Sequence, residues 1–117
     1  MSIAWSSEQL AKVARVLKEN DVDSSRCAVA AKRILPVARE LDPNAIGRRC
    51  TPRFGRFVDP KRRWFYHATV RAALHYVDSL TGPFGTEEAE YLQTYWADDA
   101  AFHWDDLTES QLKDLAP

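Results

Sequence analysis

Three side chains of this sequence, Cys27, His67 and Asp78, have the types and the order needed for nucleophilic chemistry by a thiol. Cys27 stands at the expected start of an amphipathic helix, where unpaired N–H groups and the positive end of the helix dipole stabilise a thiolate. A histidine within reach takes the thiol proton, and an acid holds that histidine in the right tautomer. The spacing therefore indicates a Cys-His-Asp site.

The histidine and the aspartate lie on two segments that predict paired strands. Residues 64–70 and 74–77 are rich in aromatic and β-branched side chains. A tight turn at Ala72-Ala73 would place His67 directly opposite Asp78, with Cβ atoms roughly 5 Å apart. A register shifted by one residue would put the two side chains on opposite faces.

Each member of this set also has a purely structural interpretation. A cysteine on an apolar helix face is often a small buried hydrophobic residue. His67 could be a satisfied strand histidine, and Asp78 could form an Asx turn at the end of a strand. Their joint occurrence, in this order and with this pairing, favours the functional interpretation.

The other cysteine and histidines are predicted to be structural. His75 would pair with Val70 in the same register and stay outside the site, and His103 lies in an aromatic tail. Cys50 has no helix start near it, so we expect a structural residue, or a disulfide partner for Cys27 that would switch the site off under oxidising conditions. The sequence has no CxxC pair and no HExxH motif, and it predicts neither a metal nor a cofactor.

Two amphipathic helices are predicted ahead of the strands. Ser6 opens a capping box, and apolar residues then recur at helical spacing as far as Asn20. The second helix begins after Ser24 or Ser25, either of which can cap it. It carries Cys27 on its apolar face, ends at 42–44, and holds Pro36, which is expected to kink or shorten it.

The second half of the chain predicts shorter elements. One or two strands are expected within 46–57, before the strand pair described above. Thr86 is predicted to cap a further helix, and Thr108 opens a second capping box before a short terminal helix. The sequence therefore predicts an α+β domain with a small antiparallel sheet and helices at both ends.

Length and composition bound the classes of protein. The 117 residues predict one domain, 1–117, and the 45% of apolar residues are enough for a core. The net charge of −1, from 16 basic and 17 acidic residues, disfavours a nucleic-acid partner. No apolar run is long enough to span a bilayer, and no signal peptide is visible.

Basic residues are concentrated in the middle of the chain, between Arg48 and Arg63. As a solvated face this basic segment needs no explanation. As a docking patch it would favour an acidic protein surface. The second interpretation is the basis of an alternative function, a non-enzymatic interaction domain such as an adaptor or an immunity-type protein.

Three segments carry a resemblance to a known family: Ser24–Cys27 with the alanine-rich helix after it, Trp64–Val70, and Tyr76–Gly82. They resemble the papain-like fold toxin domains at the C-termini of bacterial polymorphic toxins and secreted effectors. In that family a cysteine opens the central helix, a histidine follows on a strand, and a "VD-x-x-TG" segment supplies the acid. The resemblance spans about residues 22–85 and implies a papain-like core.

The resemblance also implies an activity and a setting. Cys27 would be the nucleophile, His67 the general base and Asp78 the orienting acid, in a virulence-associated thiol hydrolase that deamidates protein glutamines, as dermonecrotic-toxin-type domains do. A cysteine protease with the same triad is the alternative. A delivered or secreted domain of this kind acts in the target-cell cytoplasm on a target protein, and a cognate immunity protein is an expected partner.

One departure from papain proteases concerns the oxyanion hole. No glutamine ahead of Cys27 clearly supplies a donor for it. Asn20 and Ser24 are the weak candidates among side chains, beside the backbone N–H of Cys27 itself.

Overall fold

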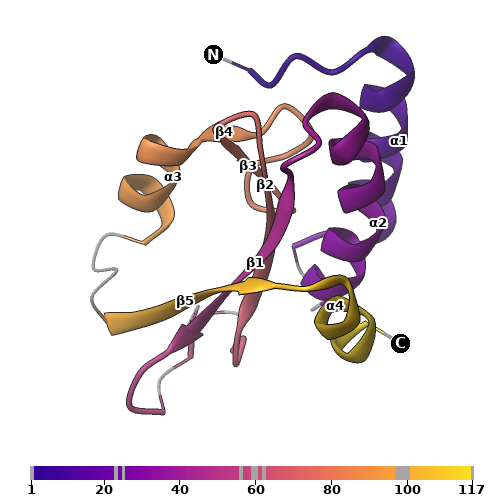
Figure 1. The fold of residues 1–117 in the computed structure, drawn as a ribbon. Coiled ribbons are helices and arrows are strands. Elements are labelled where there is room, and N and C mark those ends of the chain that lie inside the picture. Colours follow the sequence, from indigo (N-terminus) through magenta and orange to yellow (C-terminus); the bar gives the residue numbers. More distant parts are fainter. Residues whose placement is uncertain are drawn as a thin grey trace.

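The computed structural model describes residues 2–22, 24, 26–55, 57–58, 61, 63–96 and 101–116. The described part of the chain is α+β, as predicted, with four helices and five strands (Figure 1). In chain order these are α1 (Ser7–Glu19), α2 (Cys27–Leu41), β1 (Ile46–Pro52), β2 (His67–Ala72), β3 (His75–Val77), β4 (Thr86–Glu87), α3 (Glu88–Tyr95), β5 (Phe102–Leu107) and α4 (Glu109–Leu115).

The strands form one antiparallel sheet in the order β4-β3-β2-β1-β5. β5 was not predicted, because its aromatic and acidic residues do not alternate clearly. The whole of β5 pairs with β1, from Gly47 opposite Leu107 to Pro52 opposite Phe102. Pairing with β1, rather than a local sequence pattern, therefore determines that residues 102–107 form a strand.

The helices cover the two faces of the sheet unequally. In Figure 1, α1, α2 and α4 lie on one side and α3 lies on the other. β2 is buried on both faces, since Ala68, Val70 and Ala72 join the core beneath α2 while His67 packs with Trp64 and Trp96 on the α3 side.

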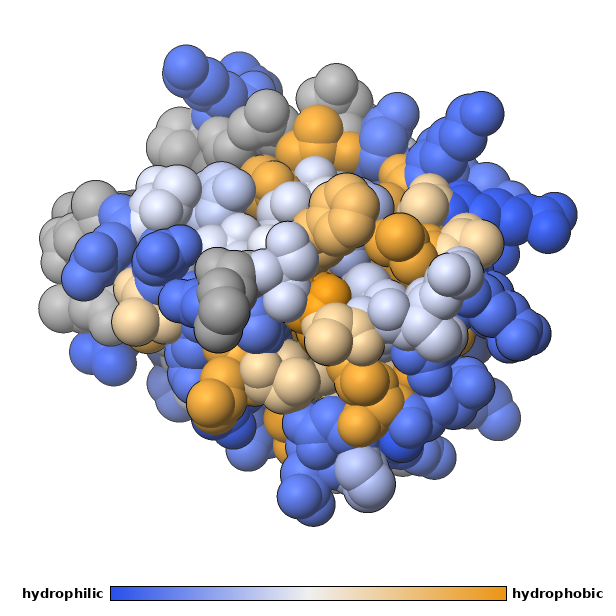
Figure 2. Space-filling model, turned by 90° about the horizontal axis from the view of Figure 1, so that it is seen from above, coloured by the Kyte–Doolittle hydropathy of each residue, from blue (hydrophilic) through white to orange (hydrophobic). Residues whose placement is uncertain are grey.

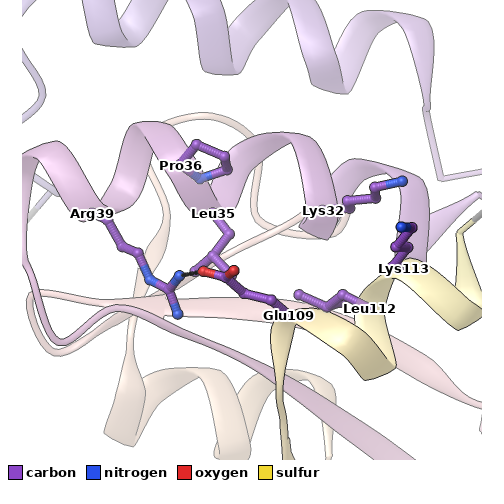
Figure 3. Close-up of a pocket in the computed structure, with 7 residues that line it drawn as sticks. All are labelled: Lys32, Leu35, Pro36, Arg39, Glu109, Leu112 and Lys113. Carbon is purple, nitrogen blue, oxygen red and sulfur yellow. Dashed lines mark hydrogen bonds and ion pairs between the residues drawn. The ribbon is translucent and has the colours of Figure 1, made fainter.

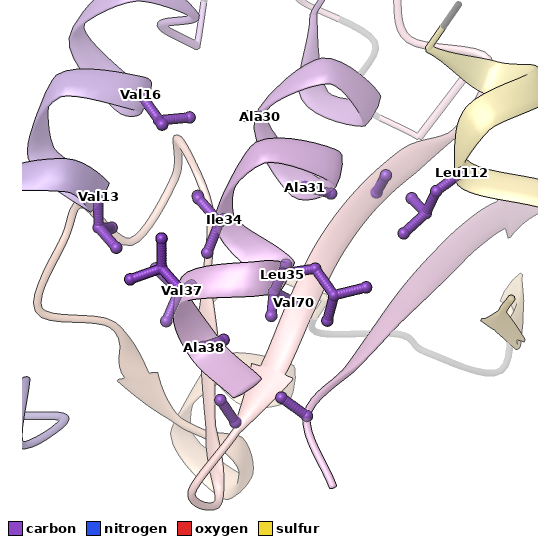
Figure 4. Packing of buried hydrophobic residues seen from close by; sticks show 14 of the residues in the cluster. Val13, Val16, Ala30, Ala31, Ile34, Leu35, Val37, Ala38, Val70 and Leu112 are labelled. Carbon is purple, nitrogen blue, oxygen red and sulfur yellow. The ribbon is translucent and has the colours of Figure 1, made fainter. Parts of the chain in front are cut away.

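The larger core lies between α1, α2 and the sheet (Figure 4). Valines of α1 meet Ile34 and Ala38 of α2, which in turn pack on Val70 of β2. Gly47 lets α4 approach β1, because a Cβ atom there would lie 2.9 Å from Leu112 Cδ1. This packing fixes α2, and therefore its first residue, against the sheet.

Both predicted capping boxes are confirmed. The Ser6 hydroxyl accepts from the Gln9 N–H, and the Gln9 side chain accepts from the Ser6 N–H. Thr108 and Gln111 make the same reciprocal pair at the start of α4.

The start of α2 differs from the prediction. Its N-cap is Arg26, with no side-chain cap hydrogen bond, rather than Ser24; Ser25 lies outside the described residues. The Ser24 hydroxyl instead donates to the Asp21 carbonyl (2.7 Å) and accepts from the Arg26 N–H (3.2 Å). Of the two effects expected of Pro36, a kink or a shortening, the shortening does not occur, because α2 packs against the core and runs through to Leu41.

The β2–β3 turn lies one residue later than predicted. Ala72 pairs with His75 and Val70 with Val77, so the turn residues are Ala73 and Leu74, at φ 49° and 62°. Positive φ at both positions is typical of a type I′ hairpin, which normally uses Asn-Gly. Tertiary contacts support it here, since Asp42 accepts from the Ala73 N–H (2.8 Å) and the Glu88 N–H donates to the Leu74 carbonyl (2.9 Å).

The sequence predicts that Thr86 caps a helix, but in the structure Thr86 caps none. With Glu87 it forms the short strand β4, where Thr86 pairs with Tyr76 and Glu87 pairs with His75. α3 begins only at Glu88, and its N-cap Glu87 makes no side-chain cap hydrogen bond. Thr86 and Glu87 pair with the free edge of β3 and therefore do not form the first turn of the helix.

Figure 2 views the molecule from the upper end of Figure 1, where β4 lies. Apolar side chains gather in the middle of this face, and hydrophilic ones surround them. α2 begins at the lower end of the molecule in Figure 1, so Cys27 lies away from this face.

Candidate functional site

The three predicted site residues stand where three elements begin or end. Cys27 is the first residue of α2, His67 is the first residue of β2, and Asp78 directly follows β3. All three side chains are buried. The sheet and the helix packed on it therefore set their relative positions.

His67 and Asp78 form a buried hydrogen-bonded pair. His67 Nε2 lies 3.1 Å from Asp78 Oδ2, so the predicted hydrogen bond is confirmed although the register is not. Moving the turn by one residue shifts the pairing by two, which keeps both side chains on the same face. His67 is consequently a diagonal neighbour of Asp78 rather than its direct partner.

Both carboxylate oxygens of Asp78 accept hydrogen bonds. Oδ1 accepts from the N–H groups of Leu80 (2.8 Å) and Thr81 (3.1 Å). Oδ2 accepts from the hydroxyl of Tyr91 (2.7 Å) as well as from His67. Burial alone would raise the pKa of Asp78, but the charge of His67 and the hydrogen bonds hold that pKa below its ordinary value. The carboxylate is thus ionised and fixed in orientation.

The imidazole of His67 is enclosed by aromatic rings. Trp64 stacks on it with a centroid distance of 5.0 Å and an interplanar angle of 18°, and Trp96 lies at 5.7 Å. Burial alone would lower the pKa of His67, but Asp78 and the interaction with Cys27 raise that pKa to about 9. The ring is therefore an imidazolium near neutral pH.

The remaining ring nitrogen of His67 is the one available to Cys27. Asp78 occupies Nε2, and Nδ1 is buried with no hydrogen-bond partner in the described part of the chain. The Cys27 side chain nonetheless interacts with His67 strongly enough to help raise the histidine pKa.

Cys27 can be reached from outside through a small pocket. The thiol residue is 8% exposed and lines a hollow of about 230 Å³ together with Arg63, Trp64, Phe65 and Tyr66. This volume is below the roughly 300–1,000 Å³ typical of ligand pockets. The hollow has room for one side chain or a small molecule at the sulfur.

The two side chains considered as oxyanion donors have other hydrogen-bond partners. Ser24 orders the turn before α2 through the contacts described above. The Asn20 amide donates to the Val16 carbonyl (3.0 Å), and its Oδ1 is an acceptor that has no partner among the described residues. Among the described residues, no side chain caps the first N–H groups of α2, and these are the donors near Cys27.

Cys50 differs sharply from Cys27. It is fully buried on β1, where its Cα partner on β2 is His67, and both cysteines are free thiols. Burial raises the pKa of Cys50 to about 12, although the charge of Arg48 opposes the shift. Cys50 is therefore a neutral, enclosed thiol.

The other two histidines lie elsewhere. His75 Nδ1 is 2.6 Å from the Ala73 carbonyl in the β2–β3 turn, and it pairs with Ala72 rather than with Val70 as the predicted register required. His103 is on β5, opposite Thr51. His67 is the histidine that interacts with Cys27.

Two arginines of the basic segment, Arg48 and Arg49, are tied to β5. Arg48 forms an ion pair with Asp106 (2.9 Å) and donates to the Tyr76 hydroxyl (2.7 Å). Arg49 forms an ion pair with Asp105 (2.9 Å). Two further arginines, at positions 56 and 62, lie outside the described residues. Arg48 and Arg49 therefore contribute little free charge to a docking patch.

A second hollow, of about 380 Å³, lies between α2 and α4 (Figure 3). Its floor is apolar, with Leu35 and Leu112, and an ion pair between Arg39 and Glu109 crosses it. It contains neither a thiol nor an imidazole. The Cys27 pocket is accordingly the better candidate for chemistry.

Tyr91 is the residue of the site that the sequence analysis missed. Its hydroxyl donates to Asp78 from α3, a helix that the sequence predicts without marking Tyr91 as a site residue. Burial and the neighbouring carboxylate raise its pKa well above the ordinary value, so it stays a protonated donor. No local signal marks such a residue, because the contact depends on how α3 lies over the sheet.

No protein-family model matches this sequence, and no curated protein or solved structure matches it. Among the described residues, no helix is long and apolar enough to cross a membrane. Nor do three or more His, Cys, Asp or Glu side chains come together there as metal ligands would.

Proposed function

We propose that this chain is a thiol hydrolase with a papain-like arrangement of Cys27, His67 and Asp78, acting on a glutamine side chain of a target protein. The single observation that carries the proposal is the buried His67–Asp78 hydrogen bond of 3.1 Å. It fixes one ring nitrogen and leaves the other for the thiol at the start of α2. The catalytic roles are those expected from the sequence and its resemblance to papain-like toxin domains.

The chemistry follows from these positions. The imidazolium of His67 stabilises a thiolate on Cys27, which attacks the carboxamide carbon. The first N–H groups of α2 stabilise the oxyanion. His67 then gives its proton to the departing ammonia, and a thioester remains on Cys27.

Water completes the cycle. His67, now neutral, removes a proton from water as the oxygen attacks the thioester carbon. The carbon–sulfur bond breaks, and the products are a glutamate side chain and the Cys27 thiolate paired with imidazolium. The net reaction is amide plus water to carboxylate plus ammonium. Throughout, Asp78 keeps the ring oriented and compensates its charge.

The size of the pocket favours deamidation over proteolysis. Peptide cleavage uses the same three residues but requires a cleft that holds several substrate residues on each side. The hollow at Cys27 measures about 230 Å³ and is bounded by Arg63, Trp64, Phe65 and Tyr66. Those dimensions suit one inserted side chain.

Intact-mass analysis of candidate target proteins tests this function. After incubation with the enzyme we expect the one-dalton gain of deamidation, and Cys27→Ala and His67→Ala should each remove it. The double variant should be no worse than either single variant, because the two residues act as a unit. Target fragments would support the protease alternative. An unchanged mass across a proteome-wide set of targets, with stable binding to one of them, would favour the interaction domain.

A further inference from the structure

An aromatic rim, made of exposed Phe65 and half-buried Phe57, borders the Cys27 pocket. Phe65 lines the pocket yet is 75% exposed, so it stands at the edge rather than the floor. The ring of Phe57 lies against it, with centroids 5.2 Å apart and planes tilted by 58°. The neighbouring Trp64 is buried and stacks on His67, which joins the rim directly to the site.

An exposed aromatic side chain of this kind is costly to leave in water. Single apolar side chains are common on protein surfaces, but Phe65 is paired with Phe57 and lines the pocket at Cys27. Aromatic residues are prominent among those that carry binding energy at interfaces. The Phe57–Phe65 pair offers ring faces and edges for stacking. Its natural occupant is therefore another apolar side chain.

We propose that this aromatic rim binds an aromatic or large aliphatic side chain of the substrate protein, adjacent in sequence to the residue that enters the Cys27 pocket. The inference rests on the proposed function, since it describes the specificity of the same site. The attacked side chain fills the hollow at the sulfur, and its neighbour lies across Phe65. Substrates with charged neighbours at that position are poorly held.

Two alkylating reagents test the rim without knowledge of the substrate. Iodoacetamide and N-benzyl iodoacetamide both form a carbon–sulfur bond with release of iodide, and they differ in the ring that the second one carries. The rate constant for each at Cys27 is measured by peptide mass spectrometry, and their ratio is compared with the ratio for glutathione. Dividing the rate constant of the benzyl reagent by that of iodoacetamide cancels any difference in the intrinsic reactivity of the thiol.

We expect the benzyl reagent to be favoured at Cys27 by about tenfold over its preference at glutathione, the factor that a good aromatic contact gives. Phe65→Ser should lower the ratio to that of glutathione. Phe84→Ser, which removes an exposed phenylalanine outside the Cys27 pocket, is the matched control and should leave the ratio high.

Two results would contradict the binding role of the aromatic rim and leave the proposed thiol chemistry intact. One is a ratio of benzyl-reagent rate to iodoacetamide rate at Cys27 equal to that of glutathione. The other is a ratio that Phe65→Ser does not change. Failure of the proposed function looks different. Cys27 would then react no faster than glutathione with iodoacetamide itself, and His67→Ala would not slow it. In that case the rim also loses its role as a substrate subsite.

Discussion

At the scale of single residues, the site is built around a buried charge pair. Asp78 receives hydrogen bonds from two backbone N–H groups, a tyrosine hydroxyl and His67. Removing one partner from a buried charged group leaves its desolvation uncompensated, which costs more than a typical hydrogen bond contributes. The pair therefore links the stability of the fold to the geometry of the site.

Tyr91→Phe should reveal this linkage. The change deletes only the hydroxyl that donates to Asp78 (2.7 Å), and we expect a loss of about 2 kcal/mol in the free energy of unfolding, as for hydrogen bonds to charged groups. Tyr95→Phe is the matched control, because that hydroxyl donates to a neutral carbonyl, Leu80, at 3.2 Å. Urea unfolding measures both variants. Equal losses would show that Asp78 does not depend on Tyr91.

The charge pair also predicts how stability varies with pH. The pKa of His67 is raised from 6.5 to about 9 in the folded protein, so its stabilising contribution is complete below about pH 6.5 and is lost as the pH rises through 9. Asp78 has a lowered pKa, so its contribution is present above its ordinary value of 3.8 and is lost as the pH falls through the folded value.

Urea unfolding of the wild type and His67→Gln between pH 5 and pH 10 checks the histidine half of this prediction. The advantage of the wild type over the variant should shrink by a few kcal/mol between about pH 6.5 and pH 9. A constant difference across this range would mean that His67 is not protonated in the folded state.

At the scale of elements, the β2–β3 turn is a strained connection, at the end of β2 away from His67. Ala73 and Leu74 both adopt positive φ, which side chains other than those of Gly and Asn tolerate poorly. Ala73→Asn with Leu74→Gly supplies the residues that a type I′ turn prefers. Leu74 is exposed, so its removal costs little packing.

The double change should raise the free energy of unfolding by about 1 kcal/mol and leave the reactivity of Cys27 as it is. Thermal unfolding, followed by circular dichroism, measures the effect. Ala73→Val, which adds a β-branched side chain at positive φ, is the opposite control and should lower the melting temperature. A lower melting temperature for the Asn-Gly variant would show that positive φ at Ala73 and Leu74 does not destabilise the protein.

The same turn explains what the sequence could and could not predict. Helical periodicity and two capping boxes predict α1, α2 and α4, apart from the N-cap of α2, since these signals are local. The hairpin register, β4 and β5 depend on which strands become neighbours, and no local pattern carries that information. His67 and Asp78 still form the predicted hydrogen bond, because the register differs from the prediction by two residues and an even shift keeps both side chains on the same face.

At the scale of the whole molecule, two layers of packing converge on Cys27. The apolar core holds α2 against the sheet, and the aromatic cluster on the other face encloses His67. Tyr91 and Trp96 belong to this aromatic cluster. No local sequence pattern connects these two residues with the site. The site thus needs both faces of the sheet to be covered, while its open side is the pocket bounded by Arg63 and Phe65.

The rate of Cys27 alkylation by iodoacetamide at neutral pH tests the central claim most directly, because it reports the thiol and its partner without a substrate. We expect Cys27 to react at least about tenfold faster than Cys50, which is fully buried and whose pKa is raised to about 12. His67→Ala should slow Cys27 by a similar factor, and Asp78→Asn should slow it less. Equal rates at Cys27 in the wild type and in His67→Ala would contradict the assignment of Cys27, His67 and Asp78 to one site.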